Sequence, residues 1–299
     1  MEAAGSAGSN GSRTGTHRRG NHPGRSVSNL IGMSLRRAVL PASWSVWSHT
    51  RADGPRNMAT DVALMAAASP ETGVWRWYGW ATPTISFGRN ERVEGRFSAA
   101  SIAEAGLAAV RRPTGGRALL HAREVTYSVT WELHEDLGWR DAYDAINGIL
   151  CGALQDLGIP VIRAGVQPPV VPDGPVCFDM PAQGELVVRG RKLVGSAVWR
   201  QGKRYLQHGS ILLQDDQALL SRAAIHPLPA IPATATLREF LPTHDETQTA
   251  AVLSAAVRQR LETVHPAALV TDFTPHASLL DDIGTREAAF LDHNRLWRR

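Results

Sequence analysis

The sequence predicts an α+β fold in which a mixed, largely antiparallel β-sheet is flanked by α-helices. Two observations support this prediction. Short runs typical of strands alternate with segments whose apolar residues recur at helical spacing, and the second half contains three strand-like runs in succession. With 299 residues, 43% of them hydrophobic and 20% charged, the chain can form a sizeable core. The sequence has no evident internal repeat, which excludes a solenoid.

The first half, in which we expect the ordered domain to begin near residue 44, contains both element types. Met58, Val62 and Met65 recur at helical spacing, whereas the run over 74–80 is rich in aromatic residues. In chain order we expect a helix over 57–68, strands over 74–80 and 84–88, a helix over 101–110, a glycine turn over 111–117, a strand over 124–131 and a helix over 141–157.

The second half opens with a loop over 164–184 that is rich in proline and glycine. Glycine-containing turns then separate strands predicted over 185–188, 192–200 and 205–213, which indicates an antiparallel meander. A proline-rich connection over 227–242 leads to helices expected over 245–263 and 279–299.

Charge is distributed unevenly along the chain. The formal net charge is +4, but residues 1–57 alone carry +6, which leaves −2 for the remainder. Residues 1–40 are expected to form a disordered basic extension, with an organelle transit peptide or a later start at Met33 as alternatives. The remainder has no basic field of the kind that binds nucleic acid.

Composition also excludes other classes of protein. No stretch approaches the roughly 18 consecutive apolar residues of a membrane helix, so we expect no membrane association. The two cysteines, Cys151 and Cys177, are too few for a zinc module or a disulfide framework. We therefore expect no metal site and a reduced, cytoplasmic protein.

Lysine is nearly absent from the chain. Of the 32 basic residues, only Lys192 and Lys203 are lysines. A buried lysine amine can lose its proton near neutral pH, whereas a guanidinium cannot. Both lysines are therefore candidates for chemistry, although a strand lysine that faces water is the more common case.

Two segments have the composition of a ligand site. Gly115 and Gly116 lie between arginines in the glycine turn, where backbone N–H groups can approach a ligand oxygen, although such a turn is usually a solvated loop. Its spacing matches neither a P-loop nor a dinucleotide-binding motif. On the strand that begins near Lys192, the small residues Gly195, Ser196 and Ala197 leave room for a ligand.

Three further residues have reactive side chains. His208 could polarise a carbonyl or act as a structural histidine, and Ser210 lacks the Gly-x-Ser-x-Gly setting of a serine hydrolase. Cys177 lies in a polar loop, and its thiolate would need a nearby cation, for which Lys192 is the obvious donor. Cys151, by contrast, is expected to pack inside a helix.

Taken together, these motifs resemble the catalytic domain of the biotin/lipoate protein ligase superfamily. Its motifs occur in order as Arg-Arg-Pro-Thr-Gly-Gly-Arg over 111–117, Lys-Leu-Val-Gly-Ser-Ala over 192–197 and His-Gly-Ser over 208–210. The run Asn-Met-Ala-Thr-Asp over 57–61 matches its opening. The similarity covers roughly residues 44–299, which implies one catalytic domain that includes the C-terminal helices.

Within this superfamily the chain is similar to the cysteine-dependent octanoyltransferases of lipoate assembly. Arg117 stands where lipoate ligases usually have a third glycine, and Cys177 precedes Lys192 by the fifteen residues typical of that branch. The resemblance implies an acyltransferase that takes octanoate from acyl carrier protein as a Cys177 thioester. The acceptor would be a lysine of a lipoyl-domain protein such as the glycine-cleavage H protein, and no cofactor would be needed.

The resemblance also implies residue roles. Cys177 and Lys192 would be catalytic: the cation would lower the pKa of the cysteine, and the neutral amine would later help to deprotonate the incoming lysine. The implied substrate-binding residues are Arg112, Gly115, Gly116, Arg117, His121, Gly195, Ser196, Ala197, His208 and Gly209. The alternatives that stay open are an ATP-dependent lipoate or octanoate ligase, an amidotransferase between lipoyl domains and a scaffold without turnover.

Overall fold

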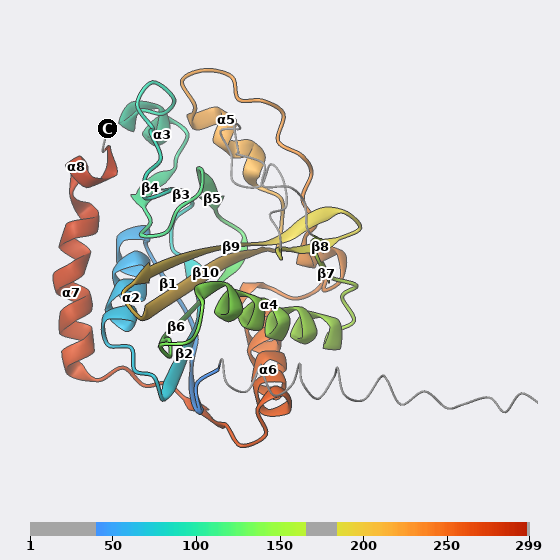
Figure 1. Cartoon of the computed structure of the whole chain (residues 1–299). Coiled ribbons are helices and arrows are strands. Elements are labelled where there is room, and N and C mark those ends of the chain that lie inside the picture. Colours follow the sequence, from blue (N-terminus) through green and yellow to red (C-terminus); the bar gives the residue numbers. More distant parts are fainter. Residues whose placement is uncertain (1–39, 166–183, 298–299) are drawn as a thin grey trace, which may run out of the picture.

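The computed structural model describes residues 40–165 and 184–297. Two β-sheets of unequal size are present, and helices cover both faces of the larger one (Figure 1). The predicted fold class is confirmed, although the strands divide between two sheets instead of forming one. The predicted nucleophile Cys177 and the predicted extension over 1–40, apart from Leu40, lie outside the described residues.

The larger sheet has eight strands among the described residues, in the order β11-β1-β2-β6-β10-β9-β8-β7. These strands are β1 (Ser43–Ala52), β2 (Thr72–Trp80), β6 (Glu124–Glu132), β7 (Ile162–Arg163), β8 (Leu186–Val188), β9 (Arg191–Gln201), β10 (Arg204–Leu212) and β11 (Leu269–Asp272). β1 pairs in parallel with β2 and β11, and the other neighbours are antiparallel. The predicted meander β8-β9-β10 is thus confirmed.

The smaller sheet has the order β4-β3-β5 and lies beside the larger one (Figure 1). It consists of β3 (Thr84–Phe87), β4 (Ala108–Arg111) and β5 (Leu119–His121). The short helices α3 (Ala99–Glu104) and α5 (Leu220–Ala223) contribute to its apolar cluster.

The helix predicted over 101–110 is wrong in its second half. α3 ends at Glu104, and Gly106 adopts a left-handed φ of 72° that reverses the chain. Residues 108–111 then form β4. The alanines of this segment favour a helix, but pairing with β3 satisfies the backbone of β4, and Val110 becomes fully buried.

Two pairs of helices sandwich the larger sheet (Figure 1). α2 (Gly54–Ala66) and α7 (Ala277–Leu291) cover one face, and α4 (Trp139–Asp156) and α6 (Glu246–Val264) cover the other. Asp53 caps the N-terminus of α2, and Asp245 caps α6 in a capping box. The helices predicted over 57–68, 141–157 and 245–263 are confirmed, with ends shifted by at most three residues, and the predicted C-terminal helix divides into α7 and α8 (His293–Leu296).

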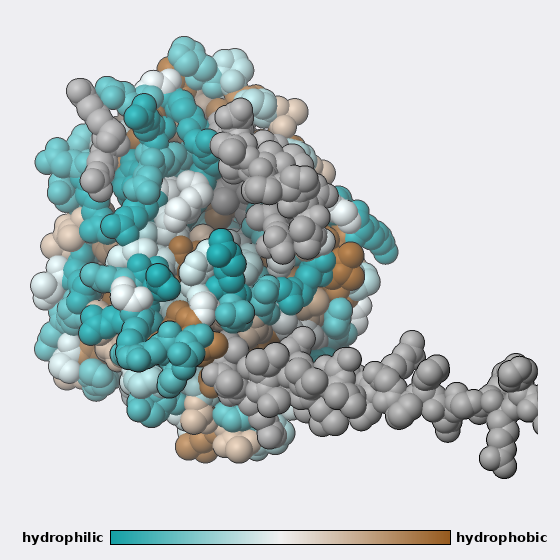
Figure 2. Space-filling model, in the orientation of Figure 1, coloured by the Kyte–Doolittle hydropathy of each residue, from teal (hydrophilic) through white to brown (hydrophobic). Residues whose placement is uncertain are grey.

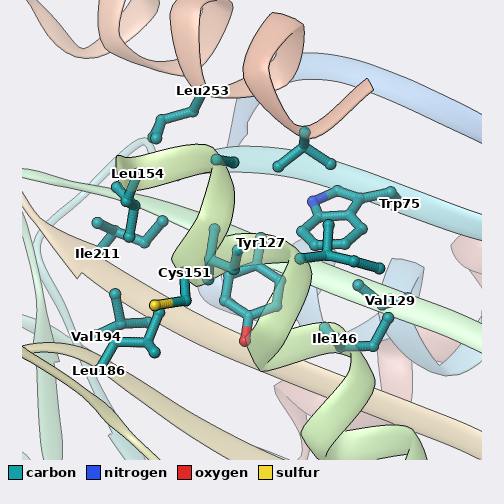
Figure 3. Packing of buried hydrophobic residues seen from close by; sticks show 14 of the residues in the cluster. Trp75, Tyr127, Val129, Ile146, Cys151, Leu154, Leu186, Val194, Ile211 and Leu253 are labelled. Carbon is teal, nitrogen blue, oxygen red and sulfur yellow. The ribbon is translucent and has the colours of Figure 1, made fainter. Parts of the chain in front are cut away.

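The main hydrophobic core lies between the larger sheet and helices α4 and α6. Figure 3 shows side chains of α4 and α6 packed against Trp75, Tyr127 and Val129 of the central strands. Because β2 and β6 are buried on both faces, nearly all their residues are apolar, aromatic or paired polar groups.

The surface contrasts with this core. The face seen in Figure 2 is mostly hydrophilic, with hydrophobic residues in small scattered spots. Within residues 40–165 and 184–297, no helix combines the length and the apolar character needed to cross a membrane.

We expect Leu253→Ala to lower the free energy of unfolding by about 2–5 kcal/mol, because Leu253 on α6 is completely buried and its removal leaves a cavity in the main core. Urea unfolding followed by circular dichroism measures this loss. Leu269→Ala, at a side chain that is 66% exposed on β11, is the matched control and should change the free energy by less than about 0.5 kcal/mol. Equal losses in the two variants would contradict the assigned core.

Candidate active site

A pocket opens between the two sheets, on the face of the larger sheet that α2 covers. It contains about 430 Å³ of empty space, its open mouth included. Its lining consists of Met58, Tyr78, Trp80, Ser86, Arg112, Leu119, His121, Thr126, Gly195, Ser196, Ala197, His208, Gly209 and Ser210. Met58, Tyr78, Trp80 and Leu119 supply a largely apolar wall beside a polar one.

The pocket brings together residues that are far apart in the sequence. Seven of the ten predicted substrate-binding residues line it: Arg112, His121, Gly195, Ser196, Ala197, His208 and Gly209. Gly115, Gly116 and Arg117 do not line it but belong to the loop that Arg112 holds in place. The three sequence motifs therefore meet at one place.

Arg112 organises the glycine turn. Its buried guanidinium donates hydrogen bonds to the carbonyl oxygens of Gly115 (3.0 Å), Arg117 (2.8 Å) and Ser86 (2.7 Å). These bonds hold the loop against β3, so Arg112 shapes the loop and the pocket wall together.

The turn and the backbone that it contacts each require a glycine. Gly116 has a left-handed φ of 99°, which L side chains rarely adopt. A Cβ atom on Gly88 would lie only 1.9 Å from the Gly116 carbonyl oxygen. The turn therefore packs directly on the backbone that follows β3.

His208 joins the turn to the larger sheet. Its Nδ1 lies 3.1 Å from a carboxylate oxygen of Asp61, and its Nε2 lies 2.7 Å from the Thr114 hydroxyl. Because a carboxylate only accepts hydrogen bonds, we assign the proton to Nδ1, and Nε2 accepts from Thr114. Burial lowers the pKa of His208 despite the nearby Asp61, which favours the neutral imidazole.

Asp61 is the centre of this polar network. Its fully buried carboxylate accepts hydrogen bonds from Arg76 (2.8 Å), Tyr78 (3.0 Å), Ser128 (2.7 Å) and His208. Burial alone would raise the pKa of Asp61, but the His208 hydrogen bond and the Arg76 charge outweigh it, so the pKa lies below its ordinary value. The carboxylate is therefore ionised and links α2 to three strands.

His121 makes a second link between the sheets. Its ring stacks on Trp80 with centroids 4.0 Å apart, and its Nδ1 donates to Glu124 over 2.8 Å. Its Nε2 lies 2.8 Å from the Ser86 hydroxyl on β3. These contacts hold β5 against the first residue of β6 and close that side of the pocket.

On β9, the hydroxyl of Ser196 lies 2.8 Å from the Tyr127 hydroxyl. Tyr127 in turn accepts a hydrogen bond from Gln207, which also donates to Asn147 on α4. Burial raises the pKa of Tyr127 to about 12, so the phenol stays protonated at neutral pH. A Cβ on Gly209 would come within 2.7 Å of both Tyr127 and the Gly195 carbonyl oxygen, so β9 and β10 meet here without room for a side chain.

The geometry of the pocket agrees with comparisons of the whole sequence. Residues 53–256 match the lipoyl protein ligase A/B catalytic domain family. The chain belongs to that family.

Sequence relatives with established names refine this assignment. The octanoyltransferase LipM of Symbiobacterium thermophilum is 37% identical over 67% of this chain and 76% of its own length. The LipM of Kyrpidia tusciae is 40% identical over 60% of this chain and 69% of its own length. These relatives confirm the family resemblance that the motifs predicted, and they show that the chain is an acyltransferase.

Solved structures show the same lipoyl ligase fold at lower sequence identity. The bipartite lipoate protein ligase of Thermoplasma acidophilum has a TM-score of 0.67 and 13% identity, covering 86% of this chain and 96% of its own. A lipoate-protein ligase A bound with ATP has a TM-score of 0.68 and 15% identity, covering 86% and 99%. At such identities the likeness concerns the fold alone.

Lys192, the lysine of the lipoyl ligase family motif, lies outside the pocket lining. It is three residues before Gly195 on β9, which corresponds to about 10 Å along a strand. Its ammonium is buried and lies 2.9 Å from a carboxylate oxygen of Glu185. Lys192 is therefore not a lysine that faces water, which was the alternative left open by the sequence.

Within the described part of the chain, neither a cysteine nor a metal site adds a reactive group to the pocket. Cys151 packs in the main core, and burial raises the pKa of its thiol, which agrees with the packing role predicted for it. Cys177 lies outside the described residues. Among the described residues, no three His, Cys, Asp or Glu side chains gather as a metal site would require.

Sequence reasoning missed the buried acids that support these residues. Asp61 belongs to a quoted motif, yet it was given no role, and Glu185 was assigned only to a strand. Asp61 could have been identified from the sequence, because it is an acid on a helix face whose other residues, Met58, Leu64 and Met65, are apolar. A charged residue on such a face needs a buried partner, and Arg76 on the aromatic strand was the available one.

Asp61→Asn should lower the free energy of unfolding by about 3–5 kcal/mol, because it leaves the buried Arg76 charge without its partner. Since the folded pKa of Asp61 is lowered, its contribution is complete above about pH 4 and is lost as the pH falls further. Urea unfolding at neutral pH and near pH 3 should therefore show a smaller pH effect in Asp61→Asn than in the wild type. Asp136→Asn, which alters a carboxylate that is 93% exposed, should behave like the wild type at both pH values.

Proposed function

We propose that this protein transfers an octanoyl group from acyl carrier protein to a lysine of a lipoyl-domain protein, such as the glycine-cleavage H protein, in lipoate assembly. The observation that carries this proposal is the meeting of three motifs at one pocket with an apolar wall, in a chain whose relatives are octanoyltransferases. The acyl group would be held covalently on Cys177 between the two halves of the reaction.

The apolar wall of the pocket suits an acyl chain. Met58, Tyr78, Trp80 and Leu119 offer apolar contact, and each buried methylene contributes about 0.8 kcal/mol. On the polar wall, the Ser196 hydroxyl would donate a hydrogen bond to the thioester carbonyl. An apolar end and a polar end are what an acyl thioester requires.

The first half-reaction forms the thioester on the enzyme. The Cys177 thiolate attacks the carbonyl carbon of the carrier-bound octanoyl group, a new C–S bond forms, and the C–S bond to the carrier breaks. The departing carrier thiolate takes a proton from the Lys192 ammonium. A thioester is exchanged for a thioester, so no ATP is consumed.

The second half-reaction forms the amide. The neutral Lys192 amine takes a proton from the incoming lysine ammonium, and the resulting amine attacks the Cys177 thioester. The C–S bond breaks and the Cys177 thiolate is restored. As the amide forms, the attacking lysine nitrogen releases one further proton to solvent. The enzyme thus returns to its starting state.

Incubation with octanoyl–acyl carrier protein should add the mass of one octanoyl group to the intact wild-type protein. Cys177→Ala should abolish this adduct and lower the rate of transfer to the H protein by at least about 1,000-fold, because the nucleophile is gone. Cys151→Ala, which alters the packed core cysteine, is the matched control and should keep both the adduct and most of the rate.

Two further reactions separate the alternatives. Retention of full activity by Cys177→Ala in the presence of ATP and free octanoate would establish a ligase instead. Transfer from an octanoylated lipoyl domain, but not from acyl carrier protein, would establish an amidotransferase. An absence of turnover with every donor would leave only a binding role.

A further inference from the structure

Lys192 on β9 forms a buried ion pair with Glu185, the residue that precedes β8. Lys192 Nζ lies 2.9 Å from Glu185 Oε2, and the two side chains are only 3% and 6% exposed. Charged groups at this depth require compensation, since a lone buried ammonium tends to lose its proton. The carboxylate of Glu185 supplies compensating charge at hydrogen-bond distance.

The backbone around Glu185 is held in place. Its carbonyl accepts a hydrogen bond from the Ala164 N–H over 2.7 Å, and the Gly184 N–H donates to the Ala164 carbonyl over 3.1 Å. Asn147 on α4 donates to the Gly184 carbonyl over 3.2 Å. Asn147 also accepts from Gln207, so the network that reaches Ser196 in the pocket also anchors the residue next to Glu185.

The titratable groups around Glu185 remain neutral or already have partners. Tyr143 on α4 and Tyr127 on β6 both have pKa values raised by burial and by the Glu185 charge, so both phenols stay protonated. Beside Gly184, the exposed carboxylate of Asp144 pairs with Arg163. On β9, Arg191 next to Lys192 pairs with Glu239. Among the described residues, Lys192 is therefore the cation that pairs with Glu185.

We propose that Glu185 is a positioning residue that keeps Lys192 in its ammonium form and fixes the direction of that ammonium on β9. The proposal rests on the function proposed above, in which Lys192 must be cationic when the Cys177 thioester forms. Glu185 remains a carboxylate throughout and exchanges no proton with substrate. It thereby sets the upper pH limit of the first half-reaction.

The near absence of lysine makes the proposal directly testable. The chain has two lysines, and each has a glutamate partner: Lys192 is buried with Glu185, and Lys203 is exposed with Glu135. A protein labelled with [ε-¹³C]lysine gives one ε-methylene signal for each of the two lysines, and the chemical shift of each signal follows the protonation of its amine during a pH titration. Glu185→Gln and Glu135→Gln form a matched pair of variants.

In Glu185→Gln, the titration midpoint of Lys192 should move to lower pH by about 1–3 units, while that of Lys203 stays in place. In Glu135→Gln, the Lys192 midpoint should not move, and the exposed Lys203 should respond only slightly. The upper pH limit of octanoyl-adduct formation should fall together with the Lys192 midpoint. Glu185→Asp, which keeps the charge on a shorter side chain, should restore part of both shifts.

Unchanged Lys192 midpoints in folded Glu185→Gln and Glu185→Asp would overturn the proposal. If Glu185→Gln does not fold, Glu185→Asp alone decides, because a small shift to lower pH supports the proposal and no shift refutes it. The titration needs no acyl donor. If the wild type forms no adduct, the function proposed above fails, whereas an adduct with an unmoved Lys192 midpoint defeats only the role of Glu185.

Discussion

The architecture depends on one ionised carboxylate in the interior. Asp61 extends from α2 and receives hydrogen bonds from β2, β6 and β10, and through His208 it also fixes Thr114 of the glycine turn. Removing a charge from water is costly, so such a group is tolerated only when its partners converge on it. That requirement sets the separation of helix, sheet and turn, and the pocket is the space that remains between them.

The pocket is built from contacts between neighbours that are distant in sequence. His121 and His208 each connect the larger sheet to the smaller one or to its turn, while Arg112 organises the turn from within. None of these three side chains is left free to act as an isolated ligand-binding group. Their common effect is to hold a rigid wall, and preorganised walls lower the cost of orienting a bound acyl group.

Much of the fold could be predicted from local patterns. The meander over β8-β9-β10 and helix α6 were predicted nearly residue for residue, because turn glycines and helical apolar spacing are local signals. β4 was not predicted, because its alanines favour a helix until β3 provides a partner. The motifs predicted seven of the fourteen residues that line the pocket. Asp61 and Glu185 were given no role, because the partners of a buried acid are identified only once the fold brings them together.

The parallel pairing of β1 has a consequence for how the chain is made. β1 covers residues 43–52, yet one of its two edges is completed by β11, which ends at residue 272. During synthesis, this edge of β1 therefore stays unpaired until the chain has emerged beyond residue 272. Because an unpaired edge can recruit strands of other chains, the late pairing of β11 with β1 also protects β1 from aggregation.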